Sequence, residues 1–188
     1  MMKSGLIFLV LILIFTTGIG CQASPIQSRY QSYSQSQSLS MKLTSPAFEH
    51  NANIPPKYTC DGDNVSPPLS ISEVPSAARS LVLIVDDPDA PNGDWVHWLL
   101  WNMPAQAMEI PENFVPGGET TDGTNSFNRT TYGGPCPPSG IHHYHFKLFA
   151  VDSMIDLPNT ATKKEVTQAI NGHIIASNDL IGLYTRKK

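Results

Sequence analysis

The chain has 188 residues, of which 12 are basic and 16 acidic, giving a net charge of −4. This length suits one folded domain with appendages. The acidic balance argues against a nucleic-acid-binding surface, and the basic tail Arg186–Lys188 is too short to create one.

The first twenty residues have the pattern of a targeting segment. Lys3 precedes an apolar run of ten residues, Leu6–Phe15, and small residues follow. A membrane-spanning helix needs about 20 apolar residues, so this run indicates a cleaved signal peptide rather than an anchor. We therefore expect residues 1–20 to be a signal peptide and the protein to be exported.

Cys21 directly follows the small residues Thr17–Gly20, an arrangement that resembles a bacterial lipobox, with Gly18 where leucine is usual. The pattern predicts lipidation of Cys21. The protein would then be a cell-envelope lipoprotein on the periplasmic or extracellular face, held to the membrane only through that lipid. Cleavage after Ala23 would instead give a freely secreted protein.

Residues 21–40 are rich in Ser and Gln and lack apolar periodicity, which predicts a solvated tether. The folded domain is therefore expected to span residues 41–188. If Cys21 carries lipid, Cys60 and Cys136 remain as an even pair. An oxidising compartment favours a disulfide between them. Two free buried thiols are the alternative, because the sequence does not show how closely their Cα atoms approach.

The folded part begins with a loop at 53–68 that is dense in turn residues. Short apolar segments bounded by Pro, Asp or Asn then predict strands. These segments are 69–73, 79–85, 95–101, 141–151 and 180–184. Strict alternation in the third segment would place Trp95, His97 and Leu99 on one face and Val96, Trp98 and Leu100 on the other. Residues 112–138 form a long polar stretch, typical of a functional or mobile loop.

One helix is predicted. Thr162–Glu165 has the pattern of a capping box, and apolar residues recur from Val166 to Ile174 at helical spacing. His173 would lie on the apolar face as a core histidine, and Asn178–Asp179 would separate the helix from the last strand. Many short strands with one helix predict a mainly β domain with antiparallel pairing.

Polar residues are concentrated in two places. Asp86–Asp94 follows a buried strand, and Gly134–Phe146 joins a stiff Pro/Gly loop to a strand that carries three histidines. Alternation places His142 and Tyr144 on one face and His143 and His145 on the other. Imidazoles, a phenol and loop N–H groups bind anions through charge-assisted hydrogen bonds, so we expect an anion site.

Three motifs resemble the phosphatidylethanolamine-binding protein family, in particular its bacterial and archaeal Raf-kinase-inhibitor-like branch. They are Asp-Pro-Asp-Ala-Pro at 87–91, Trp-x-His at 95–97 and Gly-Pro-x-Pro-Pro-x-Gly-x-His-x-Tyr-x-Phe at 134–146. The similarity extends over about 43–184. It implies a large antiparallel central sheet packed on a smaller sheet, with one or two peripheral helices and a small anion pocket at one end.

The resemblance also implies which residues act. The pocket would be lined by Asp87, His97, Gly134, His142 and Tyr144. Asp89, Pro91 and Pro135 would shape its loops. Many family members have arginine where this chain has His143, which the alternation directs away from the pocket. The chain also lacks the additional C-terminal helix of the mammalian members, so their kinase-inhibitor and membrane-lipid roles are not carried over.

The resulting hypothesis is a non-enzymatic module that holds phosphate, a phosphorylated head group or a carboxylate, and that acts on a protein partner the sequence does not identify. No cofactor and no metal are expected, because alternation separates the three neighbouring histidines. Asp87, His97 and His142 are the remaining possible metal triad. One alternative is an exported protease or kinase-type inhibitor acting through 112–138. Another is a weak hydrolase with Asp87 and His97 as its acid/base pair.

Overall fold

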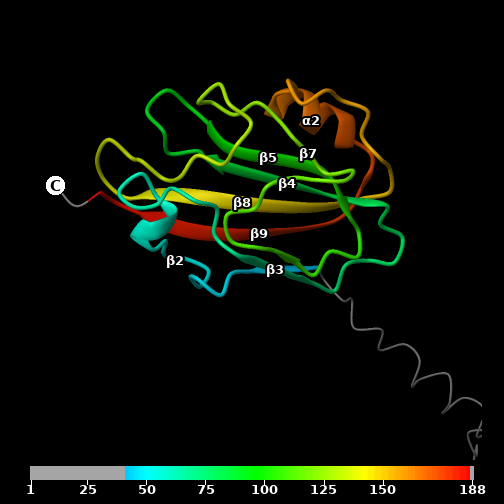
Figure 1. Cartoon of the computed structure of the whole chain (residues 1–188), viewed down its shortest axis with the longest axis horizontal. Coiled ribbons are helices and arrows are strands. Elements are labelled where there is room, and N and C mark those ends of the chain that lie inside the picture. Colours follow the sequence, from blue (N-terminus) through cyan, green and yellow to red (C-terminus); the bar gives the residue numbers. More distant parts are fainter. Residues whose placement is uncertain (1–40, 187–188) are drawn as a thin grey trace, which may run out of the picture. The chain divides into compact units, whose positions relative to one another are not determined.

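The computed structural model describes residues 41–186. The expected signal peptide, the tether and Cys21 lie outside the described residues. Two sheets, one α-helix and one 3-10 turn are present in the described part (Figure 1). The strands are β1 (Lys42–Thr44), β2 (Ala52–Asn53), β3 (Leu69–Ser72), β4 (Ser80–Asp87), β5 (Trp95–Pro104), β6 (Glu109–Ile110), β7 (Thr121–Asp122), β8 (His142–Val151) and β9 (Ile174–Tyr184). The helical segments are η1 (Pro56–Tyr58) and α2 (Lys163–Ile170).

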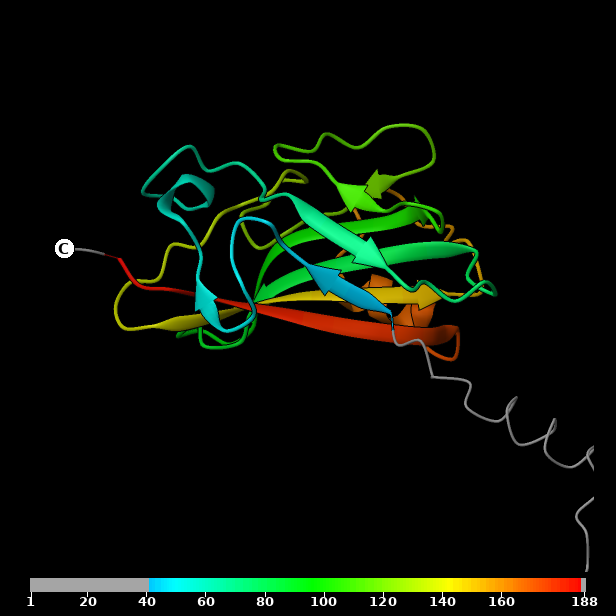
Figure 2. The same cartoon turned by 90° about the horizontal axis from the view of Figure 1, so that it is seen from below.

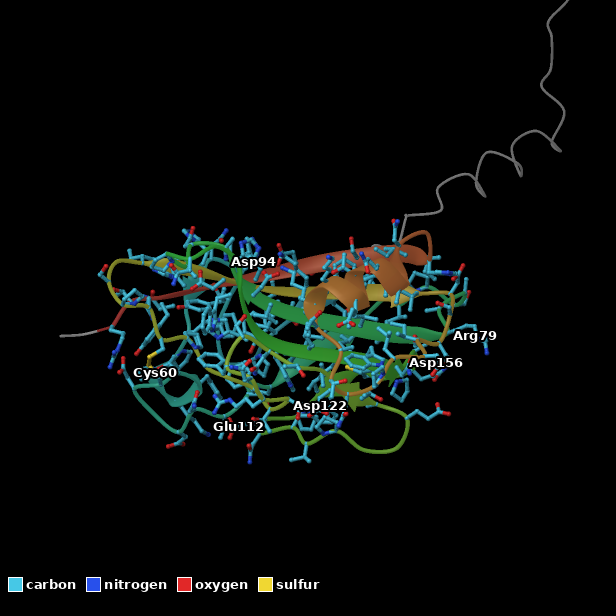
Figure 3. The ribbon with its side chains drawn as sticks, turned by 90° about the horizontal axis from the view of Figure 1, so that it is seen from above. Cys60, Arg79, Asp94, Glu112, Asp122 and Asp156 are labelled. Atoms are coloured by element: carbon cyan, nitrogen blue, oxygen red, sulfur yellow. A yellow bond between two sulfur atoms is a disulfide. The ribbon has the colours of Figure 1, made fainter. Side chains whose placement is uncertain are left out.

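The large sheet has the strand order β2-β9-β8-β4-β5-β7, and all its pairs are antiparallel except β2 with β9. The small antiparallel sheet has the order β1-β3-β6. The small sheet lies in front of the large sheet in Figure 2, whereas α2 lies in front of it in the opposite view of Figure 3. The expected mainly β architecture, a large antiparallel sheet packed on a smaller one with peripheral helices, is confirmed.

Two hydrophobic cores follow from this layering, and β4 contributes to both. Leu81, Leu83 and Val85 pack in the core shared with the small sheet. Val82 and Ile84 point the other way, into the core beneath α2. A strand buried on both faces reads as a continuous apolar run, which is what the sequence shows here.

A β-bulge interrupts the pairing of β4 with β5. Asp86 pairs with Val96, whereas Val85 pairs with Trp98, so His97 is the additional residue on β5. A bulge turns the extra side chain out of the regular alternation and bends the strand locally. The predicted alternation along β5 is therefore wrong beyond His97.

The consequence is visible in the packing on either side of the bulge. Trp98 belongs to the core shared with the small sheet, and Leu99 belongs to the core beneath α2. The ring of His97 stands edge-on to Tyr144, 5.2 Å away between centroids, on the same side as Trp98. His97 and Leu99 thus face opposite sides of the sheet.

The predicted helix is shorter than its apolar periodicity suggests. Its start is as predicted, because the Glu165 carboxylate accepts the Thr162 backbone N–H at 2.8 Å in a capping box. The helix ends at Ile170, since Gly172 has a φ of 84° and reverses the chain. With eight residues, α2 is short, and no helix within 41–186 is long and apolar enough to cross a membrane.

The expected core position of His173 is wrong. This side chain is exposed, and its Nδ1 lies 2.7 Å from Asp152 Oδ1. The expected break at Asn178–Asp179 is also wrong, because β9 runs through both residues. Each has a polar partner on or beside the sheet: Asn178 accepts the Leu43 N–H, and Asp179 pairs with His145.

Candidate functional site

One cavity of about 240 Å³ lies at the end of the large sheet where β4 finishes and β5 and β8 begin. Its lining combines polar side chains from the strand ends with apolar residues from the loops. The lining residues are Asp87, Ala90, Pro91, Asn92, Trp95, His97, Phe127, Cys136, Pro137, Pro138, His142 and Tyr144. Four of the five residues expected to bind a ligand therefore meet here.

The pair formed by Asp87 and His142 is the most polar part of the wall. His142 Nδ1 lies 2.7 Å from Asp87 Oδ2, and both side chains are more than nine-tenths buried. Antiparallel pairing of β4 with β8 ends with Asp86 opposite His145, so the two strand ends adjoin and the side chains of Asp87 and His142 meet just beyond the last pair. Because the carboxylate accepts at Nδ1, the other imidazole nitrogen, Nε2, is left for a ligand.

His97 contributes a second imidazole of different character. Its Nδ1–H donates to the carbonyl oxygen of Gly133 at 2.5 Å. Burial lowers the pKa of His97, although the Gly133 carbonyl and the charge of Asp87 oppose this change. We infer that His97 is neutral near pH 7, with a lone pair on Nε2.

Tyr144 supplies the phenol of the site and is 1% exposed. Its ring stacks near that of His142, with centroids 6.5 Å apart. Its hydroxyl is buried and makes no hydrogen bond of good geometry within residues 41–186, although the Asp87 carboxylate and the Cys136 backbone lie close enough to act on its pKa. Burial and the charge of Asp87 raise the pKa of Tyr144 well above its ordinary value, so the hydroxyl keeps its proton.

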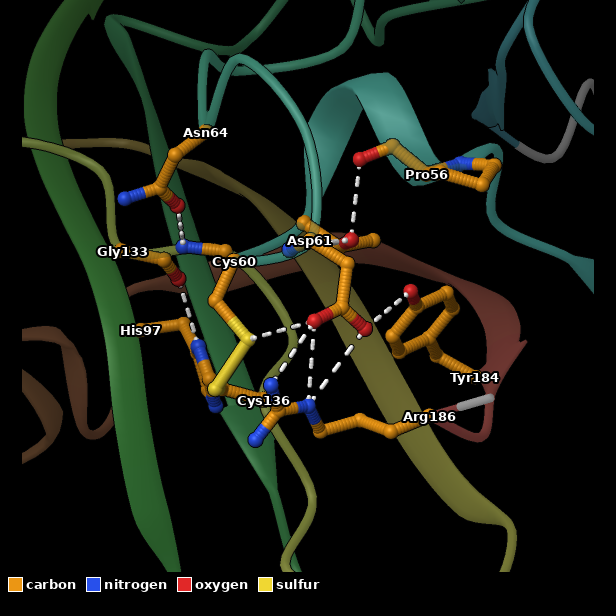
Figure 4. Close-up of a disulfide and its surroundings, with 11 residues drawn as sticks. Pro56, Cys60, Asp61, Asn64, His97, Gly133, Cys136, Tyr184 and Arg186 are labelled. Carbon is orange, nitrogen blue, oxygen red and sulfur yellow. Dashed lines mark hydrogen bonds and ion pairs between the residues drawn. A yellow bond between two sulfur atoms is a disulfide. The ribbon is translucent and has the colours of Figure 1, made fainter. Parts of the chain in front are cut away.

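Gly134 and Pro135 lie behind the wall rather than in it. The Gly134 N–H, expected to face a ligand, instead donates to Asn64 Oδ1 at 2.8 Å (Figure 4). A Cβ at Gly134 would lie 2.6 Å from that oxygen and from the Tyr58 carbonyl oxygen, so only glycine fits. The Pro135 carbonyl accepts the Cys60 N–H at 3.1 Å. Both residues position the loop that forms the wall.

Cys60 and Cys136 are joined by a disulfide, with their Cα atoms 5.4 Å apart (Figure 4). Cys136 belongs to the cavity wall, and Cys60 follows η1. Beside the bridge, Asp61 accepts hydrogen bonds from the Tyr184 hydroxyl and the Arg186 guanidinium. The wall is thereby connected to the C-terminal end of β9, which is distant in sequence.

The loop after β4 forms the opposite side of the cavity, and Pro91 lies in its lining. Asp89 does not line the cavity but fixes this loop. Its N–H donates to Asp87 Oδ1 at 2.9 Å, and its carboxylate accepts from His143. His143 therefore points away from the cavity, as alternation predicts, and so does His145, which pairs with Asp179.

Asn125 and Phe127 are among the residues around the cavity that the sequence-based prediction did not include. Asn125 is 4% exposed, and its amide donates to the backbone carbonyls of His97 and Thr131, at 3.2 and 2.7 Å. Phe127 closes the cavity with its ring edge-on to His97. An aromatic residue within a polar loop was a usable signal for Phe127, whereas no local pattern distinguishes Asn125 from other loop asparagines.

The contacts of Asp87, His97 and Cys136 affect the hydrolase and metal-site alternatives. Asp87 is hydrogen-bonded to His142, and no hydrogen bond joins it to His97 within the described part of the chain. Cys136 is bridged and offers no thiolate. Within 41–186, no group of three or more His, Cys, Asp or Glu side chains is arranged to hold a metal ion.

Comparison with known proteins gives a consistent result. The family described as phosphatidylethanolamine-binding protein matches residues 44–185. A relative named UPF0098 protein from Methanothermobacter thermautotrophicus is 46% identical over 150 residues, covering 78% of this chain and 99% of the relative. UPF0098 protein PH1269 from Pyrococcus horikoshii is 42% identical over 194 residues, covering 99% of this chain and 91% of the relative.

Two solved structures have similar folds. A putative phosphatidylethanolamine-binding protein homologue from Chlamydia trachomatis matches with a TM-score of 0.75 and 39% identity, covering 79% of this chain and 99% of that one. YbcL from E. coli, described as a new member of the mammalian family, matches with a TM-score of 0.73 and 30% identity, covering 78% and 99%.

Proposed function

Because the chain belongs to the phosphatidylethanolamine-binding protein family, we propose that it is a non-enzymatic module that holds a small anion in the cavity at the end of its large sheet. The anion is a phosphate, a phosphorylated head group or a carboxylate. The module acts on a protein partner through the occupied cavity. The anion is held near Asp87, His97, His142 and Tyr144, which all line the cavity.

The observation that carries this proposal is the buried hydroxyl of Tyr144, which belongs to a residue of the cavity wall and makes no well-formed hydrogen bond within 41–186, although the Asp87 carboxylate and the Cys136 backbone lie near it. Leaving a buried donor unsatisfied costs about 1–3 kcal/mol. An anion oxygen in the cavity would accept this proton and remove that cost. The raised pKa of Tyr144 supports the same role, because a phenol that stays protonated remains a donor.

The size and polarity of the cavity limit the ligand. Its volume of about 240 Å³ is below the roughly 300–1,000 Å³ of drug-sized ligand pockets, so a head group fits and a lipid chain does not. Asp87 would repel an anion unless its charge is balanced. The His142 imidazole lies 2.7 Å away, and its hydrogen bond to the Asp87 carboxylate offsets part of that repulsion.

Export is part of the proposal and has separate support. The leader and lipobox-like pattern lie at the N-terminus, and the disulfide is typical of an oxidising compartment. The match to the Pyrococcus horikoshii relative covers 99% of this chain, so it takes in the leader as well as the domain. We propose a lipid on Cys21 as the attachment to the membrane.

Calorimetric titration with inorganic phosphate and with phosphoethanolamine tests the site. His142→Ala should weaken both ligands, because it removes the group that balances Asp87. His173→Ala is the matched control: it also breaks a histidine–aspartate pair at 2.7 Å, but its histidine does not line the cavity. Equal affinity in wild type and His142→Ala would refute this site.

A further inference from the structure

The charges around the cavity are mostly neutralised by partners within the protein. Asp87 faces His142, and the fully buried Asp86 accepts from both Lys147 and Lys163. Lys163 also reaches Asp94, on the loop that follows β4. An anion entering the cavity would therefore meet histidines and a phenol but no lysine or arginine in the lining.

Three described cations make no ion pair. They are Arg79, Arg129 and Lys164. Arg79 lies at the opposite end of the molecule from Cys60 in Figure 3, far from the cavity wall. Lys164 is on α2. Arg129 alone among the three is next to a residue of the cavity.

Arg129 is held beside the cavity by an aromatic stack. Its guanidinium carbon lies 5.0 Å from the ring centroid of Phe127. That ring stands edge-on to two lining residues, Trp95 at 5.4 Å and His97 at 5.5 Å. One ring thus separates the guanidinium from the cavity, and Arg129 makes no side-chain hydrogen bond to another described residue.

Hydrogen bonds to Asn125 fix the turn that carries Arg129. Asn125 Oδ1 accepts the N–H groups of Phe127 and Arg129, at 2.9 and 3.3 Å, and the Asn125 amide holds this turn to the carbonyl of His97. At Gly133, a Cβ would lie 2.4 Å from the Phe127 ring and 3.1 Å from an Arg129 nitrogen. The glycine therefore leaves room for the stacked pair to lie against the cavity wall.

From these contacts we infer that Arg129 is a specificity-determining residue, which selects phosphate monoesters over carboxylates at the mouth of the cavity. The inference rests on the proposed anion site. A guanidinium offers a planar fork of donors that matches two phosphate oxygens, and a dianion gains more from a cation than a monoanion does. The side chain is exposed, and its guanidinium rests on Phe127, which itself lines the cavity.

Calorimetric titration with phenyl phosphate and benzoate, at about pH 8 where the monoester is a dianion, tests this inference. The two probes share an apolar ring and differ in the anion. Arg129→Gln should lower the affinity for phenyl phosphate about tenfold and that for benzoate less than about threefold. Arg129→Lys should fall between, because the charge remains and the fork is lost. Arg79→Gln, which removes the same charge at the other end of the sheet, should change neither.

Each other outcome has a distinct meaning. Unchanged phenyl phosphate affinity in Arg129→Gln, an equal loss for both probes, or an equal loss in Arg79→Gln overturns the role of Arg129. If the role of Arg129 is overturned but wild type binds the probes and His142→Ala does not, the proposed anion site still stands. If wild type binds neither probe, the proposed function fails together with the inference. Arg129 is exposed and makes no ion pair, so its variants should fold.

Discussion

Asp89 accepts two hydrogen bonds from His143, one from the backbone N–H at 2.9 Å and one from the imidazole Nδ1 at 2.6 Å. The two residues are 54 positions apart in the chain, on the loop after β4 and on β8. This contact holds the loop after β4 against β8, on the side that faces away from the cavity. His143, which does not touch the cavity, thus acts on its shape through Asp89.

Asp89→Ala should free this loop with little effect on global stability. Both side chains are about half exposed, so the pair should contribute under about 1 kcal/mol to the free energy of unfolding. Hydrogen exchange should become faster in residues 88–93, which the contact holds. Asp179→Ala breaks the equivalent pair with His145 and should leave the exchange of 88–93 unchanged. Unaltered exchange in Asp89→Ala would show that the contact between Asp89 and His143 does not hold this loop.

Tyr144→Phe should change stability and affinity in opposite directions. Removing a buried donor that has no partner should leave the free energy of unfolding unchanged or raise it by up to about 1 kcal/mol. The same variant should bind phosphate about fivefold to tenfold more weakly. Urea denaturation and calorimetry measure the two effects. Tyr184→Phe, whose hydroxyl donates to Asp61 at 2.7 Å, should lower stability and leave affinity unchanged. A destabilised Tyr144→Phe would show that the hydroxyl has a partner.

His97 should make stability depend on pH below neutrality. Burial lowers its pKa in the folded state, whereas the unfolded chain takes up a proton near its ordinary value of about 6.5. Between these two pKa values the unfolded state binds more protons, so the free energy of unfolding falls as the pH falls through that window.

Urea denaturation at about pH 7 and about pH 5 measures this effect. The loss of stability on acidification should be smaller in His97→Asn than in wild type. His173→Asn changes an exposed histidine and is the control. It should lose as much stability on acidification as wild type does. Titration of the ring signals by NMR gives a direct check, and a His97 midpoint above about 6.5 contradicts the assignment.

The disulfide should stabilise the domain and hold the cavity wall. Its loop spans 76 residues, for which chain entropy predicts about 4.5 kcal/mol. Reductant should raise the intact mass by about 2 Da and lower the urea midpoint. The double variant Cys60→Ser with Cys136→Ser should show the lower midpoint without reductant and no further response to it. An unchanged mass on reduction would mean that the two thiols are free.

Asp86 should be the most sensitive charged residue of the fold. Its side chain is 0% exposed and accepts from two lysines. Asp86→Asn leaves Lys147 without its counter-charge and Lys163 with Asp94 alone, and it should lower the free energy of unfolding by about 3 kcal/mol. Glu73→Gln, which breaks the exposed pair with Lys42, should cost under about 1 kcal/mol. Equal effects of the two variants in denaturant titrations would contradict this ranking.

Features that depend on local periodicity could be predicted without the structure. Alternation along β8 placed His142 and Tyr144 on one face, and the capping box placed the start of α2, because side-chain direction repeats with a backbone period of two or 3.6 residues. The apolar run of β4 likewise indicated burial on both faces. These properties need no partner segment to be known.

Contacts between distant groups depend on the packing of the whole domain. The bulge at His97 is a mismatch of register between two strands, so it appears in neither strand alone. The choice of His142 rather than His97 as the partner of Asp87, the clamp by Asn125 and the approach of Cys60 to Cys136 all depend on how the sheet edges and loops pack. Such contacts join residues tens of positions apart, and their distances are set by the whole fold rather than by any local pattern.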